Sequence, residues 1–374
     1  MAGAILNRQL TAHRSAVQFA VAEQKHDGEI RRLLRDNPTL GNISLSFTRE
    51  PDYFADALGH FGDKQTIVAT YGEKVICVGN CLTRTCFVNG QPKRVGYLGG
   101  LRLDASVSGQ FSVLRRGYEF FRELQTEAPA DFYFTSIAAD NTRARHFLEA
   151  GINGMPKYEF IGEYITLVIP TNQKASAKKG AACVQDTAEF LDFLNEHNSQ
   201  FQFAPCWSEH EIAGLKAFGL DSNTQAIESE DKLISCAKLW DQRLIKQTVI
   251  HSYSRSLRVA RPIVNLVAPI LQQPQLPAVG TTLSQAYISC LAYGPDYSHS
   301  SHELIGDLNT IAASKGIQFT VAGFAANNPT VHSLIRNLKC RQYRSRIYVV
   351  RWPDCGGTTN ELDQRPIGPE VALL

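Results

Sequence analysis

Two similar segments, one in each half of this chain, constrain its fold more than any other feature. Residues 136–151 read SIAADNTRARHFLEAG and residues 323–338 read GFAANNPTVHSLIRNL. Each passes from the end of a strand through two alanines and a polar residue to an asparagine, where a helical pattern begins. The small, polar and basic stretch 171–182 between them indicates a linker. The sequence therefore predicts a tandem repeat, with domains at 1–170 and 183–374.

The hydrophobic periodicity of the first half predicts a mixed α/β domain. Several strands of antiparallel type come first, and then strand, helix, strand, helix and strand alternate. The turn sequences YGEK and VNGQP separate three of the early strands. The expected strands are 17–22, 65–71, 74–80, 82–88, 97–103, 132–138 and 159–168, and the expected helices are 27–36, 52–61, 113–124 and 142–150.

The second half repeats this order and adds one long insert. Residues 240–282 have no counterpart of that length in the first half, and their apolar residues alternate with basic ones such as Arg243, Lys246 and Arg258. This pattern predicts an amphipathic helix packed on the core with a solvated basic face, or else a surface for an anionic ligand or partner. The other expected helices are 187–198, 209–218, 304–312 and 330–338, and the expected strands are 225–228, 232–239, 285–293, 318–324 and 346–351.

The stretch YLGGLRLDASVSGQFSVLRRGYEFFREL, residues 97–124, is the strongest candidate for a binding site. It begins as a strand, passes through a turn with Gly109 and several serines, and continues as an amphipathic helix. The first N–H groups of a helix have no partner within the helix, and the helix dipole favours an anion there. The N–H groups of residues 109–113 are therefore a candidate cradle for a phosphate, with Arg115 and Arg116 as sources of positive charge.

Composition narrows the class of protein. The chain has 374 residues, of which 44% are apolar and 20% charged, and a formal charge of +2, so nothing favours nucleic acid as a general partner. Its nine cysteines are scattered and several lie in apolar runs, which indicates reduced, buried thiols in a cytoplasmic protein. We expect no metal: the cysteines form no CxxC pair, and an HxxH at His299 and His302 is accounted for by helix-capping serines.

No membrane partner is expected either. The N-terminal residues contain no apolar core followed by a cleavage site, and no run approaches the roughly 20 apolar residues that a membrane-spanning helix needs. The motifs of P-loop enzymes, of serine hydrolases, of HExxH metalloproteases and of dinucleotide-binding folds are missing.

The element order, the glycine-bearing turn and the asparagine before the next helix resemble the GNAT superfamily of N-acetyltransferases. The resemblance implies an α/β (α+β) fold of two GNAT-like domains, each a twisted, mixed, mostly antiparallel sheet flanked by helices. It also implies acetyl-CoA as acyl donor, with its pantetheine arm along a bulged strand edge at Gly99 and Gly100 and its diphosphate at the turn, and the second domain is expected to be degenerate. The implied cofactor-binding residues are Leu101, Arg102, Leu103, Ser108, Gly109, Gln110, Phe111, Ser112, Val113 and Asn141.

The sequence departs from the GNAT pattern at several of these positions. Ser108 stands where the family has arginine, Phe111 and Val113 stand where it has glycines, and Leu148 stands where it often has a tyrosine that protonates the departing thiolate. Asn141 is equally well explained as a helix N-cap.

The resemblance implies direct attack of an amine on the thioester within a ternary complex. The catalytic residues are not identified by the motif. Tyr97, Asp104 and Tyr133 are the candidates within reach, although Tyr97 also fits the core and Asp104 also fits a cap. The aromatic and acidic stretch 46–59 would suit a cationic amine, from a small molecule or a peptide, or is simply a surface helix.

Three hypotheses follow from the sequence. The first is an acyl-CoA-dependent N-acyltransferase, with acetyl-CoA as the expected donor and a primary amine as acceptor. The second is a degenerate GNAT-like module that binds coenzyme A or a peptide without turnover, which the missing arginine, glycines and tyrosine favour. The third is a scaffold whose basic insert, 243–261, binds nucleic acid.

Overall fold

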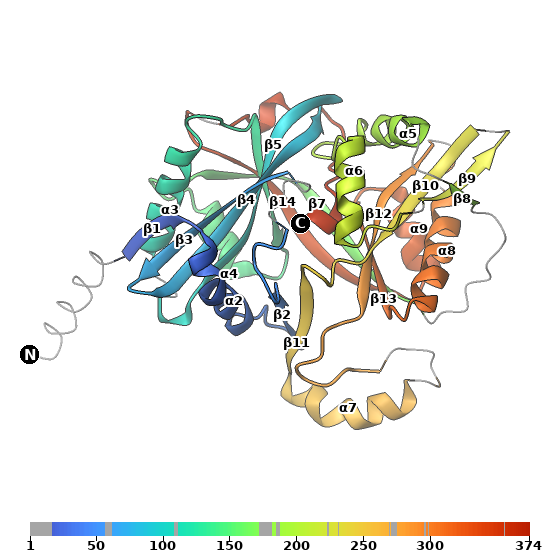
Figure 1. Ribbon diagram of the computed structural model, residues 1–374, viewed down its shortest axis with the longest axis horizontal. Helices are drawn as coiled ribbons and strands as arrows, with labels where there is room; N and C mark the ends of the chain where they lie inside the picture. The colour runs from blue at the N-terminus through green and yellow to red at the C-terminus, as the bar shows by residue number, and fades with distance from the viewer. Residues whose placement is uncertain are drawn as a thin grey trace, which may run out of the picture.

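The computed structural model describes residues 17–374 apart from short gaps at 57–61, 108–110, 172–181, 185–187, 223, 231, 269, 271–274, 295–296, 298 and 355. Within these residues, twelve strands form one continuous sheet that runs the length of the molecule, with helices on both faces (Figure 1). The strand order is β1-β3-β4-β5-β6-β14-β7-β13-β12-β10-β9-β8.

The N-terminal half builds one end of this sheet. Its first strands are antiparallel neighbours, whereas β5 and β6 are parallel because the crossover helix α3 (Phe111–Leu124) lies between them in the chain. Helix α2 (Asp27–Asp36) packs its apolar face on one side of the sheet through Ile30 and Leu33, and α3 packs on the other through Val113 and Phe121. The remaining elements are β1 (Val17–Val21), β3 (Asp63–Tyr71), β4 (Lys74–Val88), β5 (Gln91–Leu103), β6 (Phe132–Ala138), α4 (Thr142–Glu149) and β7 (Lys157–Pro170).

The C-terminal half repeats this plan at the other end. Helix α8 (Ser300–Ser314) buries Leu304, Ile305 and Leu308 against one face, and α5 (Ala188–Asn198) buries Phe190 and Leu194 against the other. Its strands are β8 (Ala182–Val184), β9 (Thr224–Ser229), β10 (Lys232–Trp240), β12 (Gln285–Tyr293), β13 (Phe319–Ala325) and β14 (Arg341–Arg351), and its further helices are α6 (Glu209–Leu215) and α9 (Pro329–Asn337).

The two halves exchange their closing strands. Strand β14 of the C-terminal half lies between β6 and β7, so that Ile347 faces both Ser136 and Gly162. Strand β7 of the N-terminal half pairs in turn with β13, from Phe319↔Pro170 to Ala325↔Tyr164. Because β14 lies between β6 and β7, and β7 pairs with β13, neither half completes its sheet without the other. This central region is also nearly all buried, with Tyr348, Val349 and Ile165 among the least exposed side chains.

Two expected helices were wrong. Residues 53–56 form a turn rather than the start of a helix over 52–61, and the rest of that stretch lies outside the described residues. In the insert, residues 247–253 form a strand, β11 (Gln247–Tyr253), instead of an amphipathic helix on the core. This strand pairs with β2 (Ile43–Thr48), which gives its alternating apolar residues a second surface to pack on. Expected strands 74–80 and 82–88 are one strand, β4.

Candidate active site

Strands β5 and β6 separate part-way along their length and leave an opening in the N-terminal half of the sheet. They pair in parallel over three residue pairs, the last of them Tyr97↔Phe134. Beyond this point β5 continues to Leu103, paired along its other edge with β4. The Thr135 hydroxyl donates to the carbonyl of Leu98 at 2.6 Å and closes the vertex of the opening. The β5 edge beyond the vertex is therefore a place where an extended ligand can add to the sheet.

A β-bulge lies on β5 just beyond the vertex. Between the pairs Asn80↔Gly99 and Val78↔Arg102, β5 has one residue more than β4. Gly100 has a φ of +64°, and a Cβ at this position would lie 2.3 Å from Nδ2 of Asn80. A side chain here would meet both backbone strain and a close contact, which accounts for glycine. The bulge expected at Gly99 and Gly100 is confirmed.

The start of α3 lies beside this strand edge. Val113 is buried with Leu101 and Leu103 of β5, so the first turn of the helix is fixed to the strand. Phe111 is 58% exposed, and its ring stacks on Phe147 of α4 with the centroids 4.8 Å apart. Because Val113 is buried against β5, its side chain points into the core and away from the helix end. The expected phosphate-binding residues Ser108, Gly109 and Gln110 lie outside the described residues, and Ser112 is half-buried in the first turn.

Asp104 fixes the connection between β5 and α3. Its carboxylate accepts hydrogen bonds from the Ser106 backbone N–H at 3.0 Å and hydroxyl at 2.6 Å. Nζ of Lys74 and Nη1 of Arg32 lie 2.9 and 3.3 Å away. Burial alone would raise the pKa of Asp104, but the bonds from Ser106 and Lys74 outweigh it and hold the pKa below its ordinary value. An ionised carboxylate with these partners anchors the turn and is a poor proton acceptor.

Tyr97 places a phenol at the vertex. Its ring packs on Phe134, with centroids 5.1 Å apart, and covers Gly99, where a Cβ would lie 2.7 Å from the tyrosine Cε1. Burial raises the pKa of Tyr97 to about 12, and the nearby guanidinium of Arg102 opposes this only in part. The side chain therefore stays a neutral phenol near pH 7, able to donate a hydrogen bond or a proton.

Arg102 is a half-buried cation on the same strand. Its Nη1 donates to the backbone oxygen of Leu101 at 2.8 Å, and burial lowers its pKa. Among the described residues, the Arg102 guanidinium forms no ion pair with a carboxylate, and its hydrogen-bond partner is the backbone oxygen of Leu101. A half-buried guanidinium without a carboxylate partner among the described residues favours an anionic or strongly polar ligand.

Tyr133 and Asn141 have structural partners. The Tyr133 hydroxyl donates to Gln125 at 2.9 Å and accepts from the Ala130 N–H at 3.0 Å, in the core on the α3 side of the sheet. The Asn141 side chain caps α4 by accepting from the Ala144 N–H at 3.2 Å. The capping interpretation of Asn141 is confirmed, and of the three catalytic candidates only Tyr97 faces the opening.

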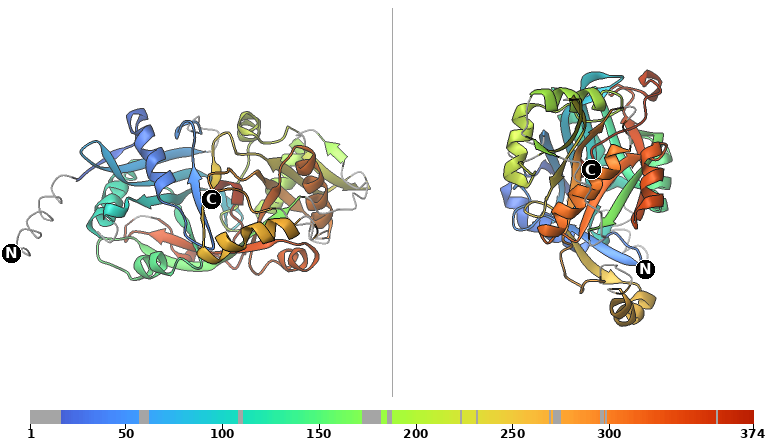
Figure 2. Two further views of the ribbon diagram at one scale, coloured as in Figure 1. Left: turned by 90° about the horizontal axis from the view of Figure 1, so that it is seen from below. Right: turned by 90° about the vertical axis from the view of Figure 1, so that its right-hand side faces the viewer.

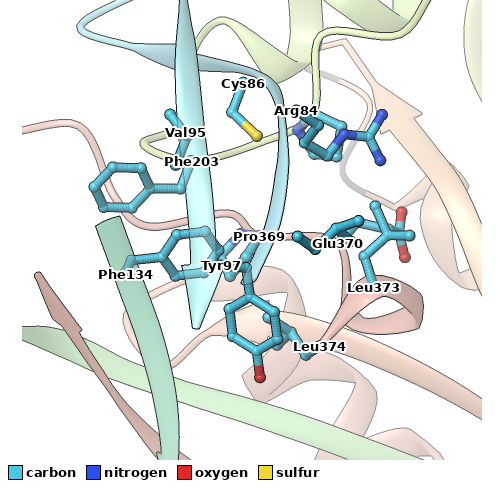
Figure 3. Close-up of a pocket in the computed structure, with 12 residues that line it drawn as sticks. Arg84, Cys86, Val95, Tyr97, Phe134, Phe203, Pro369, Glu370, Leu373 and Leu374 are labelled. Carbon is cyan, nitrogen blue, oxygen red and sulfur yellow. The ribbon is translucent and has the colours of Figure 1, made fainter. Parts of the chain in front are cut away.

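A cavity of ≈20 Å³ lies beside Tyr97, between the two halves of the molecule (Figure 3). Arg84 and Phe134 of the N-terminal half line it together with Glu370 and Leu374 from the last residues of the chain. This space is about the size of one water molecule. No local sequence pattern links the residues near position 370 to Tyr97, so their approach could not be predicted from the sequence.

The C-terminal half contains an equivalent opening that its own chain fills. Strands β12 and β13 pair in parallel up to Tyr287↔Val321, and a bulge follows, where Cys290 has a φ of +52°. The carboxylate of the half-buried Glu370 accepts a hydrogen bond from the Cys290 backbone N–H at 3.3 Å. The short helical turn Val371–Leu373 packs on both strands. The position that is a candidate ligand edge in β5 is thus occupied in β12.

A group of half-buried cations, Arg49, Lys64 and Lys246, lies where the two halves meet, and sequence reasoning missed it. Asp56 forms ion pairs with Arg49 and with Nζ of Lys64, the latter at 2.7 Å. Burial, and secondly the charge of Arg49, lower the pKa of Lys64 to about 8 and of Lys246 to about 7, while Asp56 opposes both shifts. Nζ of Lys246 donates to the backbone oxygen of Leu374 at 2.9 Å. The described part of 46–59 is therefore not the acidic surface expected from the sequence.

The cysteines and histidines form no metal centre within the described residues. No group of three or more histidine, cysteine, aspartate or glutamate side chains there could hold a metal ion. The seven cysteines whose side chains are described are free thiols, and burial raises the pKa of Cys77, Cys81 and Cys86 to about 12. No described helix is long and apolar enough to cross a lipid bilayer.

Solved structures with the same fold were found. Saccharomyces cerevisiae N-myristoyltransferase with bound myristoyl-CoA is 13% identical and aligns with a TM-score of 0.60, over 95% of this chain and 89% of its own. A second structure of that enzyme with myristoyl-CoA is 12% identical and gives a TM-score of 0.60, over 95% and 85%. A GCN5-related N-acetyltransferase from Sphaerobacter thermophilus is 11% identical and gives 0.54, over 89% and 95%.

No protein-family model matches this sequence, and no curated protein matches it. At identities this low, the structural likeness establishes the fold alone. The chain has the GNAT-superfamily fold, in a two-half arrangement like that of N-myristoyltransferase.

Proposed function

We propose that this GNAT-fold chain is an acyl-CoA-dependent N-acyltransferase whose active site is the opening between β5 and β6. The observation that carries the proposal is the bulged β5 edge beyond Tyr97, which lies next to the start of α3. The C-terminal half is the less favoured site, because Glu370 already occupies the backbone of its bulge.

The shape of coenzyme A fits this edge. Its pantetheine arm is extended and carries two amide groups, so it can pair with backbone groups of β5 in the way that an added strand does. The diphosphate would then lie at the N-terminus of α3, where backbone N–H groups and the helix dipole favour an anion. Arg115 in the first turns of α3 is 52% exposed in its side chain and has only a long contact of 3.6 Å with Glu119, which leaves it available to a phosphate.

The chemistry is direct attack of a neutral amine on the thioester carbonyl. The C–N bond forms, the C–S bond breaks, and coenzyme A leaves as a thiolate while the amine loses a proton to water or another base. A backbone N–H near the bulge would stabilise the developing oxyanion. Tyr97, as a neutral phenol at the vertex, would donate a proton to the thiolate. We assign Tyr97 the role of general acid, which in the GNAT family often belongs to a tyrosine at the position where this chain has Leu148.

The acyl group is proposed to be acetyl and the acceptor a primary amine of a small molecule or a peptide. Acetyl is the acyl group that the resemblance to the GNAT superfamily implies. The N-myristoyltransferase structures contain myristoyl-CoA, so a long-chain donor must be tested beside the short one.

Thermal-shift titrations with coenzyme A, acetyl-CoA and myristoyl-CoA test donor binding, and thiol release with panels of amines and peptides tests turnover. We expect stabilisation by acetyl-CoA and thiol release that depends on the amine. Stronger stabilisation by myristoyl-CoA than by acetyl-CoA would show that the donor carries a long acyl chain instead of acetyl. The absence of any shift at saturating coenzyme A would refute the proposal.

A binding module without turnover is the second candidate. The observation that favours it is that Asp104 and Glu370, the carboxylates near the two openings, are both committed to other partners. Stabilisation by acetyl-CoA without thiol release across the whole amine and peptide panel would support this alternative.

A further inference from the structure

The insert projects from the body of the molecule and ends in an isolated helix. Strand β11 pairs with β2 as a separate two-stranded ribbon, and helix α7 (Arg255–Val267) follows at the far end of that ribbon (Figures 1 and 2). None of the residues of α7 is buried. Contrary to the sequence-based expectation, this helix does not pack on the core of the C-terminal half.

One face of α7 is held against the ribbon and the adjoining loop. Leu257 packs with the small apolar cluster of Ile250, Tyr253 and Leu276. Nε of Arg261 donates to the Leu276 oxygen at 3.1 Å, and Asn265 exchanges two hydrogen bonds with the backbone of Leu276. Positions 257, 261 and 265 share one side of a helix because four residues advance the turn by about 400°. These contacts fix the rotation of α7 about its axis.

The opposite face is apolar, and none of the residues that the structure describes covers it. Val259, Ile263 and Leu266 lie about half a turn from the anchored positions, and they are 80%, 69% and 76% exposed. We call these three residues the α7 stripe. Ile270, one turn further on, is also 79% exposed. A rigidly held helix that presents several large aliphatic side chains to water is typical of an interaction surface.

The charge around the stripe has one sign. Arg255 and Arg258, both exposed, lie along one side of the stripe. The sequence has no aspartate or glutamate anywhere from 242 to 295, so residues 247–282 of the insert carry positive charge with no acidic residue among them. Helices that lie in the surface of an anionic membrane combine aliphatic residues on one face with arginine or lysine at its border.

We propose that α7 docks the protein on an anionic lipid surface, with the stripe inserted at the boundary of headgroups and acyl chains. Helix α7 stands at the end of the projecting ribbon (Figure 2). Because its anchored face is held on that ribbon and the adjoining loop, the stripe is turned away from them and can meet a flat surface. Of the arginines of α7, only Arg255 and Arg258 are exposed. A nucleic-acid site contacts several phosphates and therefore needs more exposed cations than these two. This proposal departs from the sequence-based expectation of no membrane partner, and it is independent of the proposed acyl transfer.

Flotation of the full chain with phosphatidylcholine vesicles, and with vesicles that also contain phosphatidylserine, tests the proposal. We expect binding to the mixed vesicles that weakens at high salt and weaker binding to phosphatidylcholine alone. The variants I263D and L266D should each reduce binding at least about tenfold, because a charge is placed in the inserted face. R255S together with R258S should remove the preference for phosphatidylserine.

L244D is the matched control, since Leu244 is 70% exposed but lies before β11, at the other end of that strand. It should bind like the unmodified chain, and all variants should give the same far-ultraviolet circular dichroism spectrum. The proposal is overturned if the unmodified chain floats with neither vesicle, or if I263D and L266D bind as well as L244D. It is also overturned if the chain is a dimer that I263D converts to monomers, because the stripe is then an interface between two copies.

Discussion

Gly100 and Cys290 occupy equivalent positions in the two halves, each as the left-handed residue of a β-bulge three residues after a tyrosine. Their φ angles are +64° and +52°, and Tyr97 and Tyr287 each end the short parallel pairing with the next strand. The halves differ in what binds the bulge: in the C-terminal half it is the carboxylate of Glu370. The same backbone feature therefore has a structural use in one half and is the candidate ligand edge in the other.

Replacing Gly100 by valine should abolish stabilisation by acyl-CoA. A Cβ here lies 2.3 Å from Asn80 Nδ2, and the left-handed conformation costs about 1–2 kcal/mol for a residue with a side chain. G72V is the control, because Gly72 has a φ of +60° and open space around a Cβ. Thermal-shift titration with acetyl-CoA should show a response for G72V and none for G100V. Equal responses would exclude the bulge from the binding site.

The variant Y97F should lower kcat while leaving donor binding intact. It removes the phenolic proton but keeps the ring that packs on Phe134. Loss of a general acid typically lowers the rate by about 10²–10⁴-fold. Because the pKa of Tyr97 is about 12, the difference between the two proteins should not change between pH 6 and 9. Y133F is the control: it removes a buried hydrogen bond to Gln125 and should lower stability with kcat unchanged.

The variant E370A should destabilise the chain more than E370Q. Alanine leaves the Cys290 N–H without its acceptor in a buried place, at a cost of about 1–3 kcal/mol. Glutamine keeps an acceptor oxygen, and since burial raises the pKa of Glu370, removal of its charge should be tolerated well. Urea unfolding measures both. If the two variants are equally stable, the carboxylate does not hold the C-terminal segment on β12.

Stability should fall as the pH drops from 7 to 5, in part because of His197. Burial lowers the pKa of His197 to about 4, against a hydrogen bond from Nδ1 to Tyr293 that raises it. Between the folded and unfolded pKa values the unfolded chain binds more protons, so the free energy of unfolding decreases with falling pH, by about 1–2 kcal/mol at pH 5. Urea unfolding of H197N should show a smaller decrease. H332N, changed at an exposed position of α9, should keep the full decrease.

Neither half should fold when expressed alone. Residues 1–176 lack β14, which lies between their β6 and β7, and residues 177–374 lack β7, which pairs with their β13. The two fragments should be soluble only when co-expressed, and should then co-purify. A soluble N-terminal fragment with a cooperative thermal transition would show that β7 can pair with β6 directly.

Local patterns predicted most elements of this fold. The bounds expected for β6 and β12 agree with the structure, and the helical faces of α3 and α8 are those indicated by Val113–Leu124 and Leu304–Ala312. The bulge at Gly100 was also predictable, because consecutive glycines in a strand have few other uses. These features depend on residues that are neighbours in the chain, and their periodicity is visible in the sequence.

The sequence by itself determined the periodic elements, the repeated order of the halves and the one-sided charge of the insert. Only the tertiary structure decided the exchange of β7 and β14, the pairing of β11 with β2, and the placement of Glu370 on Cys290. Each of these joins residues far apart in the chain. A strand's alternation specifies which face it buries but not which neighbour it pairs with, so the partner is selected by the packing of the whole sheet.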